Sequence, residues 1–172
     1  MKSRKLERKP LSFSTTMRNP ERIALFIENL KEFEGKILTK EIIMKIVEKL
    51  IKNKLYVPLY IKRIPHLKKI FENDTKSFSE KEIKGIIENS PQNHKEAGFE
   101  KGWDSRFDTW YKLSKEFGFI YYEMEKPIEI SQTGHMLCDA YSESGNDSSG
   151  EKIQKIFLLL LNNPRNLKII YQ

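Results

Sequence analysis

The chain has 172 residues, of which 38% are hydrophobic and 32% are charged, and its formal net charge is +7 at pH 7. Such a composition is typical of one globular domain, with or without a small appendage. It excludes a membrane-spanning segment, because the longest apolar stretch, Ile156–Leu161, is far shorter than the roughly 20 residues that a bilayer requires. A single cysteine, Cys138, excludes an internal disulfide and a zinc site with several cysteine ligands. The basic N-terminus has no apolar signal region, so we expect a cytoplasmic location.

Two basic blocks lie in the first half of the chain. Residues 1–18 contain six Lys and Arg residues against a single acid, Glu7, interleaved with hydroxyl side chains, and we expect them to form an arm. The second block runs from Lys36 to Lys69, with Glu41 and Glu48 as its acids. Clustered cations attract nucleic-acid phosphates whatever the base sequence. Lysine-rich surfaces are also common in proteins from AT-rich genomes, so charge alone leaves the partner open.

The first predicted elements are helices. Asn19 and Pro20 are typical of a helix start, and apolar residues continue at helical spacing until Gly35. A second helix is expected after Thr39, with an isoleucine-rich stripe on one face and lysines on the other. Residues 60–71 predict a third helix, around Pro65.

The middle of the chain predicts a further pair of helices. Ser79 and Glu82 have the spacing of a capping box, which opens a helix that Asn89–Pro91 ends. Residues 95–102 predict a loop. Trp103–Phe117 predicts the second helix of the pair, capped at Asp104 or Ser105, with Trp110 and Tyr111 on its buried face.

The remaining predicted elements are strands and helices. Residues 119–123 and 128–130 predict two short strands joined by a turn. A helix capped by Ser131 or Thr133 follows, in which Cys138 is expected to be a small buried hydrophobic residue. Residues 142–150 predict a flexible linker, and 151–162 a strongly apolar helix.

This order of elements predicts a fold that is mainly α with a small β wing, an α+β helical domain containing a winged helix-turn-helix. The helix pair 78–88 and 103–117 would cross so that the second helix stands out from the surface and fits the major groove of DNA. We divide the chain into a basic arm (1–18), a winged-helix DNA-binding domain (19–141), a linker (142–150), and a helix that begins a further subdomain or interface element (151–172).

The predicted recognition helix supplies most of the candidate DNA contacts. Arg106 is the best candidate for a base contact, because its guanidinium matches the O6 and N7 atoms of guanine. The lysines near it are expected over phosphates. The acids of the same helix nearly cancel its positive charge. The candidates on and beside this helix are Lys101, Ser105, Arg106, Thr109, Lys112 and Lys115.

Metal and nuclease sites are not expected in this chain. His66, His94 and His135 share no ligand spacing. Three Glu-x-Lys triplets resemble part of a Mg²⁺-nuclease centre, at 7–9, 34–36 and 82–84. The first two precede every Asp in the chain, and the third lies in a predicted helix rather than a strand.

Two stretches are similar to a known family. Ser12–Ile23 resembles the Ser-rich opening of AlwI-type restriction endonucleases, which continues Arg-x-Pro-Glu-Lys/Arg-Ile. Phe117–Leu137 resembles the wing and closing helix of that family, and Ser105-Arg106 falls where the family has Thr/Ser-Arg.

The resemblance implies a function and a set of partners. In type IIS enzymes of this family, the N-terminal portion recognises an asymmetric double-stranded DNA site, and a separate C-terminal Mg²⁺-dependent nuclease domain cuts beside it. This chain would be the recognition portion, non-catalytic and without a cofactor of its own. By the family pattern, Arg18 and the hydroxyls of Ser14, Thr15 and Thr16 would contact DNA.

Two alternatives stay open at this point. A winged-helix transcriptional regulator would dimerise, with the apolar Ile153–Leu161 helix as a possible dimerisation element. A protein-interaction module without a DNA partner would suit the near-neutral charge of the helix that begins at Trp103.

Overall fold

The computed structural model describes residues 20–93, 95, 98–142 and 149–161. The predicted arm, with Ser14, Thr15, Thr16 and Arg18, lies outside the described residues. So do His94, most of the predicted linker and residues 162–172. The described part is mainly helical with a small two-stranded antiparallel sheet, which confirms the predicted α+β class. Each of its helices is too short or too polar to span a bilayer.

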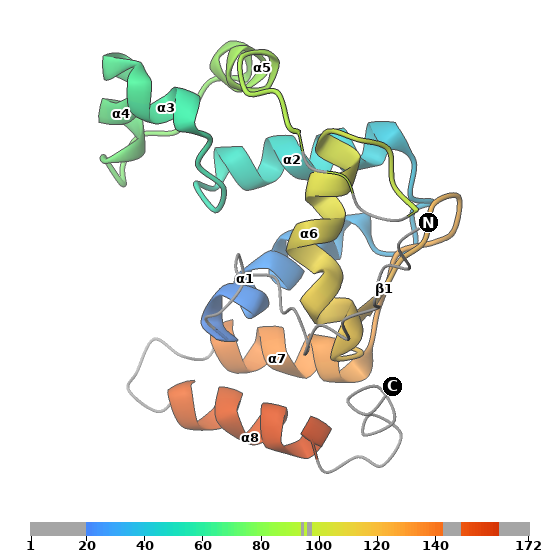
Figure 1. Ribbon diagram of the computed structural model, residues 1–172. Coiled ribbons are helices and arrows are strands. Elements are labelled where there is room, and N and C mark those ends of the chain that lie inside the picture. Colours follow the sequence, from blue (N-terminus) through green and yellow to red (C-terminus); the bar gives the residue numbers. More distant parts are fainter. Residues whose placement is uncertain (1–19, 94, 96–97, 143–148, 162–172) are drawn as a thin grey trace, which may run out of the picture.

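Three helices form the centre of the protein. α1 (Pro20–Leu30), α2 (Lys40–Lys52) and α6 (Trp103–Glu116) all pack against one another, and α6 crosses α2 and runs past α1 (Figure 1). Phe26 of α1 meets the rings of Trp110 and Tyr111 edge-on, with centroids 6.2 and 5.8 Å apart. The Tyr111 hydroxyl donates to the Phe26 carbonyl at 3.1 Å. The prediction that Trp110 and Tyr111 belong to the core is therefore confirmed.

Local sequence signals set the start of α2. A 3₁₀ turn, η1 (Lys31–Phe33), follows α1, and Gly35 then takes a positive φ of 76°, a conformation that glycine adopts without strain. α2 begins directly after Thr39, as predicted, and Thr39 caps it, because its side chain accepts a hydrogen bond from the Ile42 amide. One face of α2 is fully apolar and buried, through Ile43, Ile46, Val47, Leu50 and Ile51.

The single helix predicted over 60–71 is two helices. α3 (Leu59–Arg63) and α4 (Pro65–Phe71) meet at Ile64, whose backbone is extended at φ −101° and ψ 112°. The prediction was wrong because the ring of a proline pushes the residue before it out of the helical region. Figure 1 shows α3 and α4 side by side at one end of the molecule, remote from α7.

The helix that packs across α6 differs from the predicted one. α5 (Glu80–Glu88) has the predicted capping box between Ser79 and Glu82, but it packs against α2. The pairing of helix 78–88 with helix 103–117 is therefore corrected, since α2 takes that place. The physical reason is that α2 offers the longer apolar stripe, with five buried side chains against two on α5.

The sheet is small but gains a third extended segment. β1 (Ile120–Tyr121) pairs antiparallel with β2 (Glu129–Ile130), with Ile120 opposite Ile130. Residues 35–38 pair with 125–128 through four backbone hydrogen bonds, including Gly35 N to Ile128 O at 2.8 Å. The segment between α1 and α2 thus borders the hairpin on the side opposite β1.

Two helices complete the described chain. The Ser131 hydroxyl caps α7 (Gln132–Ser142) by accepting from the Gly134 amide at 3.1 Å. α7 packs on α1, and α8 (Ser149–Leu161) packs on α7. Ile153 and Ile156 of α8 are buried within the same chain, so this part of its apolar face is not available to a second copy. Cys138 on α7 is buried, as predicted.

Candidate nucleic-acid interface

The beginning of α6 is covered by the loop that precedes it. The helix starts at Trp103, with Gly102 at its N-cap and φ at 125°, so the predicted cap at Asp104 or Ser105 is wrong. The glycine allows the chain to turn directly into the helix. Glu100 of this loop forms an ion pair with Lys40 at 2.8 Å, and its hydrogen bond raises the pKa of Lys40. The loop is thereby joined to the start of α2.

Ser105 and Thr109 do not reach the surface. The Ser105 hydroxyl donates to the Glu100 carbonyl at 2.6 Å, and the Thr109 hydroxyl donates to the Ser105 carbonyl at 2.9 Å. Both side chains are buried, so the prediction that α6 presents them outward is wrong. The reason is tertiary, because α6 has packed neighbours on several sides, whereas a recognition helix needs one free face.

Arg106 is half-buried rather than presented. Its Nε donates to the Gln92 side-chain oxygen at 2.8 Å, and the Tyr56 hydroxyl donates to the same oxygen at 3.3 Å. The side chain therefore lies against the segment that follows α5. In this conformation it lines a pocket instead of projecting toward a base pair.

The three candidate lysines have different environments. Lys115 is half-buried, with its Nζ donating to the Tyr122 carbonyl at 2.9 Å and lying 4.7 Å from the centre of the Tyr122 ring. These contacts hold it away from the predicted position over a phosphate. Lys101 and Lys112 are exposed. Lys112 and Glu116 are the exposed side chains of α6, so this helix offers no continuous polar face.

Positive charge gathers in the segment that holds α2 to α5. Residues 36–84 contain thirteen Lys and Arg residues against six Asp and Glu residues, a net charge of +7 that equals the charge of the whole chain. The rest of the described chain is therefore not the source of the positive charge. This segment carries the positive charge that a phosphate-binding surface requires.

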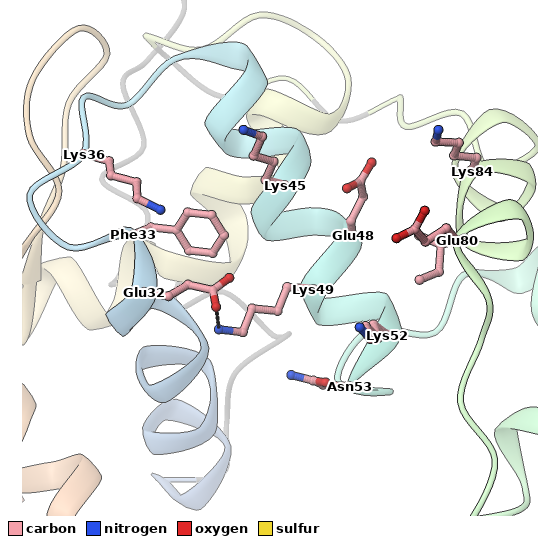
Figure 2. Close-up of a pocket in the computed structure, with 11 residues that line it drawn as sticks. Glu32, Phe33, Lys36, Lys45, Glu48, Lys49, Lys52, Asn53, Glu80 and Lys84 are labelled. Atoms are coloured by element: carbon pink, nitrogen blue, oxygen red, sulfur yellow. Dashed lines mark ion pairs between the residues drawn. The ribbon is translucent and has the colours of Figure 1, made fainter.

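A groove of about 700 Å³ lies between η1, α2 and α5 (Figure 2). We call it the lysine groove. Two of its lining side chains, Phe33 and Ile83, are buried and apolar, and the remaining lining side chains are polar or charged. The charged ones are Glu32, Lys36, Lys45, Glu48, Lys49, Lys52, Glu80 and Lys84.

Three lysines of the groove have neither an ion-pair partner nor an aromatic-ring contact among the described residues. Lys45 and Lys52 come from α2 and Lys84 from α5, and all three are exposed. The other two differ, because Lys49 Nζ pairs with Glu32 at 2.7 Å and Lys36 Nζ lies 4.9 Å from the centre of the Phe33 ring. Unpaired ammonium groups can exchange counterions for phosphates at little cost, which makes these three the best candidates for DNA contacts.

Two carboxylates reduce the positive electrostatic potential of the groove. Glu48 on α2 and Glu80 on α5 extend into the space between the two helices (Figure 2). With Glu32 they leave the groove five lysines against three glutamates. The groove is therefore positive but not uniformly so, and its acids should weaken the attraction of a polyanion.

Sequence reasoning located only half of this groove. The spacing of Lys45, Lys49 and Lys52 places them on one helix face, and the lysine-rich face of that helix was predicted. Lys84 and Glu80 were missed, because nothing in the local pattern shows that α5 packs beside α2.

In the described residues, no group of three or more His, Cys, Asp or Glu side chains could hold a metal ion.

Comparisons with protein-family models, with curated proteins and with solved structures found no match to this chain.

Proposed function

We propose that this chain binds double-stranded DNA and that the lysine groove is its main contact with the phosphate backbone. The observation that carries the proposal is the concentration of charge: residues 36–84 have a net charge of +7, and one groove is lined by three lysines of that segment that have neither an ion pair nor a ring contact among the described residues. Lysines placed in this way supply affinity that does not depend on base sequence.

The proposed architecture is a winged helix with an insertion. α1, the extended segment 35–38, α2, α6 and the β1–β2 hairpin follow one another in the order of that fold, and α3 to α5 would be inserted between its second and third helices. In this scheme α6 has the position of the recognition helix. Because the loop before it and the segment after α5 cover its first turns, we assign the DNA contact to the lysine groove.

The finer proposal is the recognition portion of a type IIS-like restriction endonuclease. It is supported by the resemblance of residues 12–23 and 117–137 to AlwI-type enzymes. Under this proposal a Mg²⁺-dependent nuclease domain would belong to the same polypeptide, and the present chain would bind its duplex without cutting it. Incubation of a duplex library with the chain and Mg²⁺ tests this, because cleavage would contradict a purely recognising role.

Salt-dependent binding is the direct test of the DNA proposal. Affinity for a fluorescent duplex should fall steeply with salt, and each phosphate contact should add roughly 0.9 to the slope of log affinity against log salt. Replacing Lys45, Lys52 and Lys84 together by Gln should therefore lower that slope by about 2 to 3.

A matched variant separates a local contact from general attraction. Lys62, Lys69 and Lys76 are exposed, lie in the same charged segment and do not line the groove. Replacing these three by Gln removes the same charge, and it should change the slope less than the groove variant does. Equal effects of the two variants would rule out the groove as the principal contact, and absence of duplex binding at low salt would overturn the proposed function.

A further inference from the structure

A second cavity of about 380 Å³ lies between the chain that follows α2 and the chain that follows α5. We call it the arginine pocket, since Arg63 of α3 and Arg106 of α6 both line it. None of the described residues that line it is acidic. Two guanidinium groups that face one cavity without a carboxylate make it a site for an anion.

Hydrogen bonding fixes the position of Arg106 and leaves its two terminal nitrogens available to a ligand. Gln92 accepts from Arg106 Nε and holds its own amide by donating to the Ser90 carbonyl at 2.7 Å. Arg106 thus has a defined position, and its two terminal nitrogens have no partner in the described part of the chain. Arg63 is exposed and likewise has no ion pair there. A preformed arginine with free donors is suited to paired hydrogen bonds with phosphate oxygens.

The arginine pocket also contains a buried hydroxyl without a hydrogen-bond partner among the described residues, that of Ser90. Ser90 lines the pocket and is 8% exposed, yet its Oγ has no hydrogen-bond partner among the described residues. Buried polar groups are nearly always satisfied, so an orphan hydroxyl beside a cavity indicates a missing acceptor or donor. A phosphate oxygen in the pocket would supply the acceptor.

We infer that the arginine pocket binds a nucleoside phosphate. Arg63 and Arg106 would hold the phosphate, and the carboxamide of Asn93, which also lines the pocket, would match the donor and acceptor pattern of a base edge. The volume falls within the usual range for small-ligand sites, about 300 to 1,000 Å³. The ligand could be a free mononucleotide or an unpaired nucleotide extruded from bound DNA, and the second source rests on the function proposed above.

Calorimetric titration of the full chain with each 5′-deoxynucleoside monophosphate tests the inference. We expect saturable binding of at least one of them, and we expect neither inorganic phosphate nor the matching deoxynucleoside to bind as tightly. Arg106→Gln and Arg63→Gln should each weaken binding by about tenfold or more, because each removes a charged hydrogen bond. Lys62→Gln is the matched control, since it removes the same charge beside Arg63 from a residue outside the pocket.

A pair of duplexes distinguishes the two sources. If the ligand belongs to DNA, a duplex with one unpaired nucleotide should bind more tightly than the fully paired duplex, and Arg106→Gln should abolish the difference. If both duplexes bind equally while the mononucleotide still binds in the pocket, the source is a free nucleotide.

The failures of the two proposals are distinguishable. If no mononucleotide binds at millimolar concentration and Arg106→Gln leaves both duplex affinities unchanged, the pocket inference is overturned while DNA binding stands. If Lys62→Gln weakens mononucleotide binding as much as Arg63→Gln, the attraction is general and the assigned site is wrong. If no duplex binds at low salt, the proposed function fails, and the mononucleotide titration alone decides the pocket. Thermal unfolding of each variant shows whether it is folded.

Discussion

The Tyr122 hydroxyl donates a hydrogen bond of 2.8 Å to the Asp108 carboxylate inside the protein. Both residues are buried, with Tyr122 3% and Asp108 7% exposed. The bond joins the residue that follows β1 to the middle of α6, next to the rings of Phe99 and Phe107. It helps to hold α6 against the hairpin.

Removing this hydroxyl should destabilise the protein. Tyr122→Phe leaves the buried Asp108 carboxylate without one of its donors, and we expect the free energy of unfolding to fall by about 1 to 3 kcal/mol. Urea unfolding followed by circular dichroism measures the change. Tyr121→Phe is the control, because the Tyr121 side chain is exposed, and a similar loss in both variants would contradict the role of the hydrogen bond.

Two glycines should respond in opposite directions to alanine. A Cβ at Gly134 would clash with the Phe119 carbonyl oxygen and come within 2.9 Å of Ile130 Cγ2, so Gly134→Ala should cost about 1 to 3 kcal/mol. Gly85 in α5 has open space around its Cα, so Gly85→Ala should stabilise by about 0.5 to 1 kcal/mol. Thermal melts of both variants check this, and a stabilised Gly134→Ala would show that α7 does not approach Phe119 and Ile130 this closely.

Stability should decline at alkaline pH. Burial raises the pKa of Tyr111 and of Tyr122 above the ordinary value of 10, and it raises the pKa of the Cys138 thiol from 9 to about 12. The folded protein therefore keeps protons that the unfolded chain loses. The stability due to these groups is complete below the unfolded pKa values and is lost as pH rises through and beyond about 9 to 10. Urea unfolding across this range measures the slope, which should be shallower in Tyr111→Phe, and a flat profile would refute the assignment.

The Cys138 thiol should be inert in the folded protein. It is fully buried on α7, and only its thiolate form would react with a disulfide reagent. We expect slow labelling in native buffer and rapid, complete labelling in denaturant. Met136→Cys places a comparison thiol on an exposed position of the same helix, and this variant should show one fast and one slow thiol. Equal rates would mean that α7 opens readily.

Neutralising the acids of the lysine groove should strengthen DNA binding. Glu48→Gln and Glu80→Gln each remove a negative charge that faces the proposed phosphate path, and we expect each to raise duplex affinity by about two- to tenfold at low salt. Anisotropy titrations measure the change. Glu116→Gln removes an exposed acid of α6 outside the groove and should have a smaller effect. A decrease of affinity in both groove variants would place the DNA elsewhere.

The fold could be read from the sequence wherever a local signal decides it. Thr39 and Ser79 begin their helices because a side chain next to the first turn accepts its free amides. Pro65 divides its helix for an equally local reason, although the sequence pattern alone was interpreted as one helix. The hairpin was predicted because strands and turn lie next to each other in the chain.

The candidate site could be read less well, because exposure is not a local property. Composition and helical spacing alone predict the two basic blocks at residues 1–18 and 36–69 and the lysines on one face of α2. By contrast, long-range packing sets α2 rather than α5 across α6 and turns Ser105 and Thr109 inward. Residues distant in the chain are brought together where α5 packs beside α2 and where the loop around Glu100 meets the start of α2. The choice among such contacts depends on how much apolar surface each one buries.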